Sequence, residues 1–171
     1  MEPIPVKLIY DLEDLLVQEF RACQTLLSLT KDERLALARS DVEALSALVE
    51  QKESMLDELA QIEDHRRMVV QEIARRLPLP APNPAVAELA AVLEPELGGR
   101  IDRLRNGINT LSSEIRELSS GNRALAASAL ERTDAVQSLL LDILRPSLNY
   151  QPPGVPCHPQ AGPAWGVDHR T

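Results

Sequence analysis

Aromatic residues are nearly missing from this chain of 171 residues, of which they make up 2%. Tyr10, Phe20, Tyr150 and Trp165 are the four. Enzyme cores and ligand pockets rely on aromatic rings, because each ring buries much more area than a leucine does. Packing must therefore come from leucine, alanine, valine and isoleucine. With 26% charged residues, this composition is typical of long helices and coiled coils.

The chain also has no basic surface, disulfide framework or membrane-spanning run. The formal net charge of −8 repels phosphate backbones, so we expect no nucleic-acid partner. The cysteines are far apart, and we expect Cys23 to be a small buried apolar residue and Cys157 an exposed thiol. No apolar run approaches the roughly 18–20 residues that cross a bilayer, and the first residues lack signal-peptide character. We therefore expect a cytoplasmic protein without membrane insertion.

The residue constellations of catalysis are not found either. His65 stands among charged residues on a predicted helix and is expected to be solvated. Cys157, His158 and His169 do not follow a strong zinc-binding spacing. The glycine pair at 98–99 follows a predicted helix end and lacks the lysine and Ser/Thr of a phosphate-binding loop. We therefore expect no enzymatic activity, no bound metal and no cofactor.

Proline and glycine divide the chain into segments. No proline occurs from residue 6 to 77, and no glycine before Gly98. Prolines alternate through 78–84, where a helix cannot continue because proline has no N–H to donate. From Pro146 onward lie six of the 13 prolines, with few apolar residues beside them. This pattern predicts an all-α domain over 1–145, containing a proline-rich linker, and a flexible, disordered tail over 146–171. The helices are expected at about 6–39, 41–77, 85–94 and 98–145.

The first proline-free run is too long for one ordinary helix. Ser40, followed three residues later by Glu43, fits a capping box, and Thr30 begins the same pattern. We place the break at Ser40, while a break at Thr30 or a continuous helix stays open. Both halves carry apolar residues at three- and four-residue spacing, which favours an elongated antiparallel hairpin. Lys52 and Arg66 interrupt the apolar stripe of the second helix.

The last long helix has the clearest repeat, with four heptads whose d position is always leucine. Isoleucine fills the a position except at the fourth heptad, where Asn122 is expected to set the register. This seam could form a parallel homodimer. We favour instead its docking on the hairpin, which gives a coiled-coil-like three-helix bundle. The a residues are Ile101, Ile108, Ile115 and Asn122, and the d residues are Leu104, Leu111, Leu118 and Leu125.

After the fourth heptad, the apolar residues cover more of the helix circumference than one seam can hide. They are either a well-buried helix end or a face that binds a helix of another protein. Few elements remain to cover them before the tail, which favours the binding face. The residues predicted to bind a partner are Leu125, Leu130, Val136, Leu139, Leu140, Ile143 and Leu144.

The order of these elements resembles the FlgN-type flagellar export chaperones. A first helix of about thirty residues leads into ARSDVEALSALVEQKESML at 38–56, which is similar to the family's turn and leucine-rich second helix. The similarity continues with NRAL at 122–125 and with NYQPPG at 149–154, which resembles the family's Tyr-Gly-x-x-Gly tail. Gln151 stands where the family often has glycine.

The resemblance implies a cytosolic type III secretion chaperone that binds the amphipathic terminal helices of hook-associated (hook–filament junction) proteins. It implies capture by the last helix and delivery to the flagellar export apparatus, for which Tyr150 is a candidate contact. Packing of Tyr150 against the bundle end is the other possibility. We expect a monomer or weak homodimer. The alternative function is a structural coiled-coil protein that self-assembles through the Ile/Leu seam.

Overall fold

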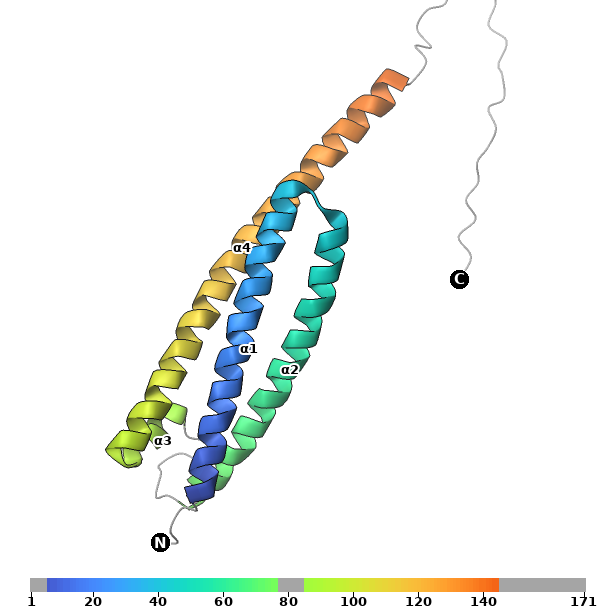
Figure 1. Ribbon diagram of the computed structural model, residues 1–171. Coiled ribbons are helices and arrows are strands. Elements are labelled where there is room, and N and C mark those ends of the chain that lie inside the picture. The colour runs from blue at the N-terminus through green and yellow to red at the C-terminus, as the bar shows by residue number, and fades with distance from the viewer. Residues whose placement is uncertain (1–5, 77–84, 145–171) are drawn as a thin grey trace, which may run out of the picture. The chain divides into compact units, whose positions relative to one another are not determined.

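The computed structural model describes residues 6–76 and 85–144, and all regular structure in these ranges is helical. The chain divides into two units, residues 1–130 and residues 131–171, which are treated separately below. The predicted all-α class and helical bundle are confirmed. The helices are α1 (Val6–Arg39), α2 (Val42–Ala74), α3 (Val86–Val92) and α4 (Pro95–Leu144) (Figure 1).

Helices α1 and α2 form the antiparallel hairpin that their apolar stripes predict. Arg66 and Lys52, the two charged interruptions in the α2 stripe, each pair with a glutamate on α1. The Arg66 guanidinium lies 2.9 Å from Glu19, and the Lys52 ammonium lies 2.8 Å from Glu33. The two ion pairs lie fourteen residues apart on each helix. Because the spacing is the same on both helices, the pairs fix one register for the hairpin.

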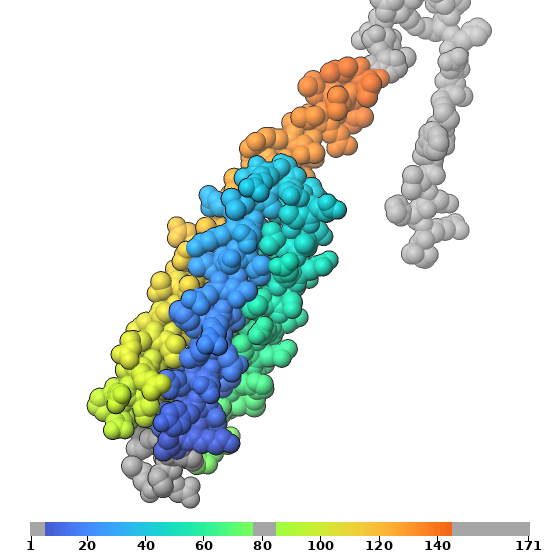
Figure 2. All heavy atoms as spheres, in the orientation of Figure 1, coloured from blue at the N-terminus to red at the C-terminus, as the bar shows by residue number. Residues whose placement is uncertain are grey.

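The first part of α4 runs parallel to α1. Arg100 pairs with Glu13 near the start of both helices, and further along Asn122 bonds to Thr30 and Glu33. Figure 2 shows α1 with α4 on one side and α2 on the other. Within residues 1–130, α1 is therefore the helix that both of its long neighbours share.

The hydrophobic core is densest at the end of the bundle where α3 packs. Each helix contributes a side chain there with at most 1% of its surface exposed: Leu12, Ile73, Leu89 and Ile101. Burying one such side chain contributes about 1.5–3 kcal/mol. Ile108 joins this core, and Leu104, Leu111 and Ile115 pack against it. The first heptads of the seam are thus used within the chain, as the bundle interpretation predicts.

The hairpin turns at Ser40, which decides between the two candidate breaks. Ser40 has a left-handed backbone (φ 56°), and the N–H groups of Ser40 and Asp41 donate to Leu37 and Ala36. This arrangement is a Schellman motif that closes α1. The expected capping role of Ser40 is wrong, because Asp41 is the N-cap and accepts from the Ala44 N–H at 3.0 Å. Ser40 is unable to cap α2 because it already serves as the left-handed C′ residue of α1.

Other boundaries differ slightly from the expected ones. α2 ends at Ala74 rather than 77, and α3 covers 86–92 rather than 85–94. α4 begins at Pro95 rather than 98, because proline suits a first helical turn, whose N–H groups need no partner within the helix. The glycine pair at 98–99 therefore lies inside α4 and does not follow a helix end. The linker over 78–84 and the tail over 146–171 lie outside the described residues.

Candidate partner-binding surfaces

The described part of the second unit, residues 131–144, is helical, and every one of its residues is exposed. It contains the segment that the sequence singled out as a binding face. The five predicted residues in this segment each expose more than half of their surface: Val136 57%, Leu139 60%, Leu140 52%, Ile143 68% and Leu144 73%. Exposure of this kind meets the first requirement for docking, while the binding role remains a prediction.

These five residues form one face of the helix, which we call the α4 stripe. They follow the i, i+3, i+4, i+7, i+8 pattern, and at about 100° per residue they occupy an arc of roughly 140°. Leu141 is also 55% exposed but lies outside this arc. The stripe continues the heptad register, since Val136 and Ile143 are at a positions and Leu139 is at d.

The remaining predicted contacts are placed differently. Leu125 and Leu130 belong to residues 1–130 and expose 39% and 64% of their surface. Leu125 is a seam residue at the end of the packed heptads, whereas Leu130 lies off the seam. Tyr150 lies outside the described residues.

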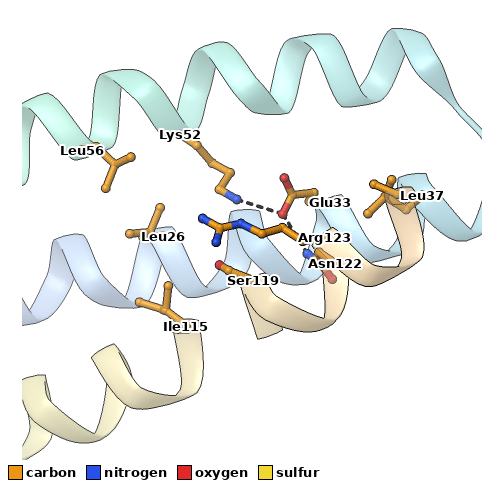
Figure 3. Close-up of a pocket in the computed structure, with 10 residues that line it drawn as sticks. Leu26, Glu33, Leu37, Lys52, Leu56, Ile115, Ser119, Asn122 and Arg123 are labelled. Carbon is orange, nitrogen blue, oxygen red and sulfur yellow. Dashed lines mark hydrogen bonds and ion pairs between the residues drawn. The ribbon is translucent and has the colours of Figure 1, made fainter. Parts of the chain in front are cut away.

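A second apolar surface, unforeseen from the sequence, is a groove between α2 and α4 within residues 1–130. The groove has a volume of about 410 Å³ (Figure 3). Its wall includes Leu56 of α2, which is 51% exposed, and Arg123 of α4 extends over it. Arg123 makes no ion pair with any residue that the structure describes. The apolar lining residues are Leu26, Leu37, Leu56, Ile115 and Ala126.

The groove exists because the turn half of the hairpin is loosely packed. α2 has no buried residue from 42 to 61, and its first buried side chain is Ile62. Val42, Val49 and Leu56 follow one another at heptad spacing and are all exposed. A row of apolar residues seven apart is the surface on which another helix packs.

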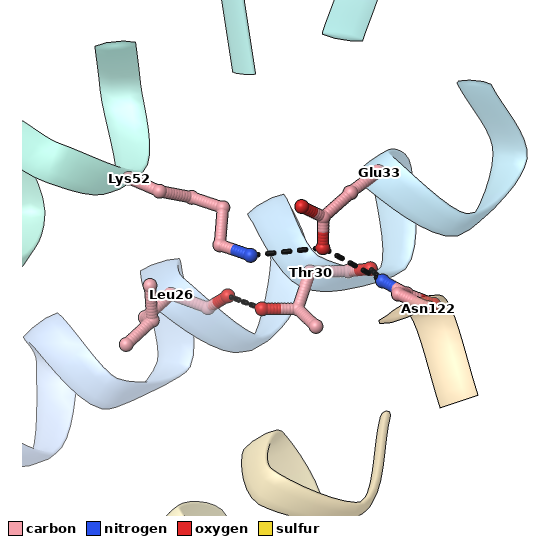
Figure 4. A network of polar contacts seen from close by, with 5 residues as sticks. All are labelled: Leu26, Thr30, Glu33, Lys52 and Asn122. Carbon is pink, nitrogen blue, oxygen red and sulfur yellow. Dashed lines mark hydrogen bonds and ion pairs between the residues drawn. The ribbon is translucent and has the colours of Figure 1, made fainter. Parts of the chain in front are cut away.

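A polar network contributes Glu33, Lys52 and Asn122 to the lining of this groove. Figure 4 shows the contacts of the network. Lys52 and Asn122 both donate to Oε2 of Glu33, each at 2.8 Å. The same Asn122 amide donates to the Thr30 carbonyl at 2.9 Å, and the Thr30 hydroxyl donates to the Leu26 carbonyl. These contacts of Asn122 hold α4 at one position along α1, which is what a register residue does.

The network lowers the pKa of Glu33. Burial by itself raises the pKa of this carboxyl, but the hydrogen bonds from Lys52 and Asn122 and the Lys52 charge outweigh it, so the pKa lies below its ordinary value of 4.5. The Asn122 side chain is 3% exposed, and its Oδ1 accepts no hydrogen bond from the described residues. Glu33 is thus held as a carboxylate next to the groove.

In the other ion pair of the hairpin, between Glu19 and Arg66, the effect of burial on the glutamate pKa outweighs that of the nearby arginine. Burial raises the pKa of the Glu19 carboxyl above 4.5 even though Arg66 pairs with it. Cys23 lies close by, and burial together with the Glu19 charge raises the pKa of its thiol. Cys23 is free and buried, as expected for a small apolar residue.

The described residues can be searched for two kinds of feature, membrane-spanning helices and clusters of metal-ligating side chains. None of the helices in 6–76 and 85–144 is long and apolar enough to cross a membrane. The same residues include no group of three or more potential metal-ligating side chains.

Comparisons with known proteins give one match. A model of the FlgN protein family matches residues 1–156, which is most of the chain and includes every helix that the structure describes. Neither the curated proteins nor the solved structures give a significant match. The resemblance seen in the sequence is therefore confirmed. The chain belongs to the FlgN family, a family of flagellar export chaperones, not enzymes, that bind hook-associated proteins.

Proposed function

We propose that this protein is a cytoplasmic chaperone of flagellar type III secretion whose α4 stripe binds the terminal helices of hook-associated proteins. Such helices are amphipathic and would associate prematurely in the cytoplasm. The stripe offers them a temporary apolar partner, and this needs neither nucleotide hydrolysis nor a catalytic residue. The observation that carries the proposal is the exposure of five large apolar side chains on one helical face.

A matched set of variants tests the stripe. Leu140→Asp and Ile143→Asp place a charge inside it, whereas Leu141→Asp places the same charge on the same exposed helix but outside the arc. We expect the first two to weaken binding of a hook-associated protein's terminal helix at least about tenfold, which corresponds to 1.4 kcal/mol. Leu141→Asp should bind like the wild type. Equal affinities for all four proteins, with unchanged circular dichroism, would exclude the stripe as the binding site.

Delivery to the export apparatus is a separate step, for which Tyr150 is the candidate contact. An aromatic side chain can anchor in a partner's pocket at low entropic cost. We expect Tyr150→Ala to keep its affinity for the client helix and to reduce export of the client in cells. If Tyr150→Ala exports its client normally, the tyrosine has no part in delivery.

The alternative, a structural coiled-coil protein, would need the Ile/Leu seam of α4 to pack against a second copy of the chain. The a residues Ile101 and Ile108 are buried inside the chain's own core, which leaves them unavailable to a second copy. This burial favours the chaperone over a scaffold that assembles through the full seam. Sedimentation of the purified protein separates the two, because a scaffold forms a stable oligomer at all concentrations.

A further inference from the structure

The groove within residues 1–130 is about three helical turns long. Its lining extends from Leu26 to Leu37 on α1 and from Ile115 to Ala126 on α4, which is about 16 Å along each helix. Leu56 of α2 forms the facing wall (Figure 3). Because the backbone groups of these walls are hydrogen-bonded within their own helices, the groove suits another helix better than an extended peptide.

The turn half of the hairpin has room for such a helix. Val49 and Leu56 are seven residues apart on α2 and are 47% and 51% exposed, so they offer an apolar row at heptad spacing. No residue of α2 from 42 to 61 is buried, so an added helix displaces no buried α2 side chain there. Docking covers apolar surface that the described residues leave in water, which drives association.

The groove also carries a positive charge that its own lining does not neutralise. Two cations and one carboxylate line it, and the Lys52 ammonium lies 2.8 Å from that carboxylate, Glu33. Arg123 is the cation that is left, because it makes no ion pair with the residues that the structure describes. The whole chain has a net charge of −8, so this cation is a local exception on an acidic molecule. An occupant that brings a carboxylate to Arg123 is therefore complementary to the groove in both charge and hydrophobicity.

We propose that the groove binds a second amphipathic helix of the client, one with an acidic side chain, and that Arg123 selects this helix by pairing with the acid. This inference rests on the function proposed above and adds a site that the α4 stripe does not supply. Because both helices belong to one client chain, binding of one raises the effective concentration of the other. Arg123 thus determines specificity, while the apolar lining supplies most of the affinity.

Affinity measurements with a full-length hook-associated protein test the groove. We expect Leu56→Asp to raise the dissociation constant at least about tenfold and Arg123→Glu at least about threefold, since an exposed ion pair contributes less than buried apolar area. Met68→Asp on α2 and Arg116→Glu on α4 are the matched controls, because they make the same changes at exposed positions that do not line the groove. Both controls should bind like the wild type, and all four variants should keep its helical circular dichroism.

Reversal of both charges tests the selection of an acid by Arg123. Peptides that span the client's terminal helices, each with one acidic residue replaced by lysine, are titrated against the wild type and Arg123→Glu. One peptide should bind the wild type more weakly and bind Arg123→Glu more tightly than the unchanged peptide does, and Arg116→Glu should show no such recovery. Salt at about 1 M, where the Debye length is about 3 Å, should reduce the difference between the wild type and Arg123→Glu. If no peptide restores binding to Arg123→Glu, the proposed selection is overturned.

Leu140→Asp, the stripe variant, separates this inference from the proposed function. If both hold, Leu140→Asp and Leu56→Asp each weaken binding of the full-length client. A loss in Leu140→Asp alone overturns the groove site and leaves the function of the stripe standing, whereas a loss in Leu56→Asp alone supports the groove and refutes the stripe. If neither variant weakens binding, both proposals fail. If Leu56→Asp binds the client more tightly than the wild type, another segment of this chain or a second copy competes for the groove, and the inference is overturned.

Discussion

Lys52 on α2 and Asn122 on α4 donate hydrogen bonds to the same oxygen of Glu33, each at 2.8 Å. One carboxylate of α1 therefore sets the level of both neighbouring helices. The Ile/Leu seam alone allows α4 to slip along α1 by whole heptads, since each heptad resembles the next. The shared oxygen distinguishes one register from the others, because slippage of α4 takes the Asn122 donor away from the Glu33 carboxylate.

Glu33→Gln tests the contribution of this carboxylate to stability. Glutamine keeps the shape of the side chain but removes the negative charge to which Lys52 and Asn122 both donate hydrogen bonds. Hydrogen bonds to a charged group contribute about 1.5–3 kcal/mol, and we expect the free energy of unfolding in urea at pH 7 to fall by about that amount. Glu50→Gln, at an exposed α2 position that makes no hydrogen bond or ion pair with the described residues, is the control and should change stability by less than about 0.5 kcal/mol.

The contributions of Glu33 and Glu19 to the stability of the protein should depend on pH in opposite ways. The pKa of Glu33 is lowered, so its contribution is present above its ordinary value of 4.5 and is lost as pH falls through the folded value. The pKa of Glu19 is raised, so its contribution is present below 4.5 and is lost as pH rises through the folded value.

Urea unfolding of Glu33→Gln and Glu19→Gln across this range measures both effects. Relative to the wild type, Glu33→Gln should lose stability as pH rises toward 4.5, and Glu19→Gln should gain stability as pH rises above 4.5. Parallel curves for the two variants would contradict the opposite pKa shifts.

The left-handed backbone of Ser40 leads to a third prediction. A non-glycine residue in this region is strained by about 1–2 kcal/mol, since its Cβ approaches the neighbouring carbonyl. Glycine removes the strain but makes the unfolded chain more flexible, so we expect Ser40→Gly to stabilise the protein by a net of up to about 1 kcal/mol. Ser46→Gly, the same change within α2, should destabilise it because a helical position has no strain to relieve. Relative to the wild type, the melting temperatures of these two variants should therefore shift in opposite directions.

The sequence predicted the helices well because apolar spacing and proline act locally. The proline-free runs contain α1, α2 and most of α4, and the stripe residues Val136 to Leu144 were found from their crowding alone. Lys52, Arg66 and Asn122 were recognised as interruptions of apolar stripes. Their partners were not, because a glutamate such as Glu33 has no local feature that distinguishes it from the many other acidic residues of a surface helix.

The groove was missed for a related reason. Its walls come from α1, α2 and α4, and it depends on how far α2 stands from α4, which no local pattern states. One signal was present in the sequence: Val42, Val49 and Leu56 repeat at heptad spacing beside the main stripe of α2. A second apolar row on a helix that already has a core-facing row indicates a second packing partner.

The paired glycines at the start of α4 provide the last prediction. A Cβ at Gly98 would collide with the backbone carbonyl of Ala90 in α3, whereas a Cβ at Gly99 would lie 3.8 Å from its nearest neighbour, the flexible end of Arg103. Gly98→Ala must displace α3 and with it Leu89, so we expect a loss of about 1–3 kcal/mol. Gly99→Ala adds a better helix former in open space and should stabilise the protein by up to about 1 kcal/mol. Urea unfolding of both variants measures the difference. Equal stabilities would mean that α3 does not pack against the first turn of α4 as closely as the structure shows, because only that contact distinguishes the two positions.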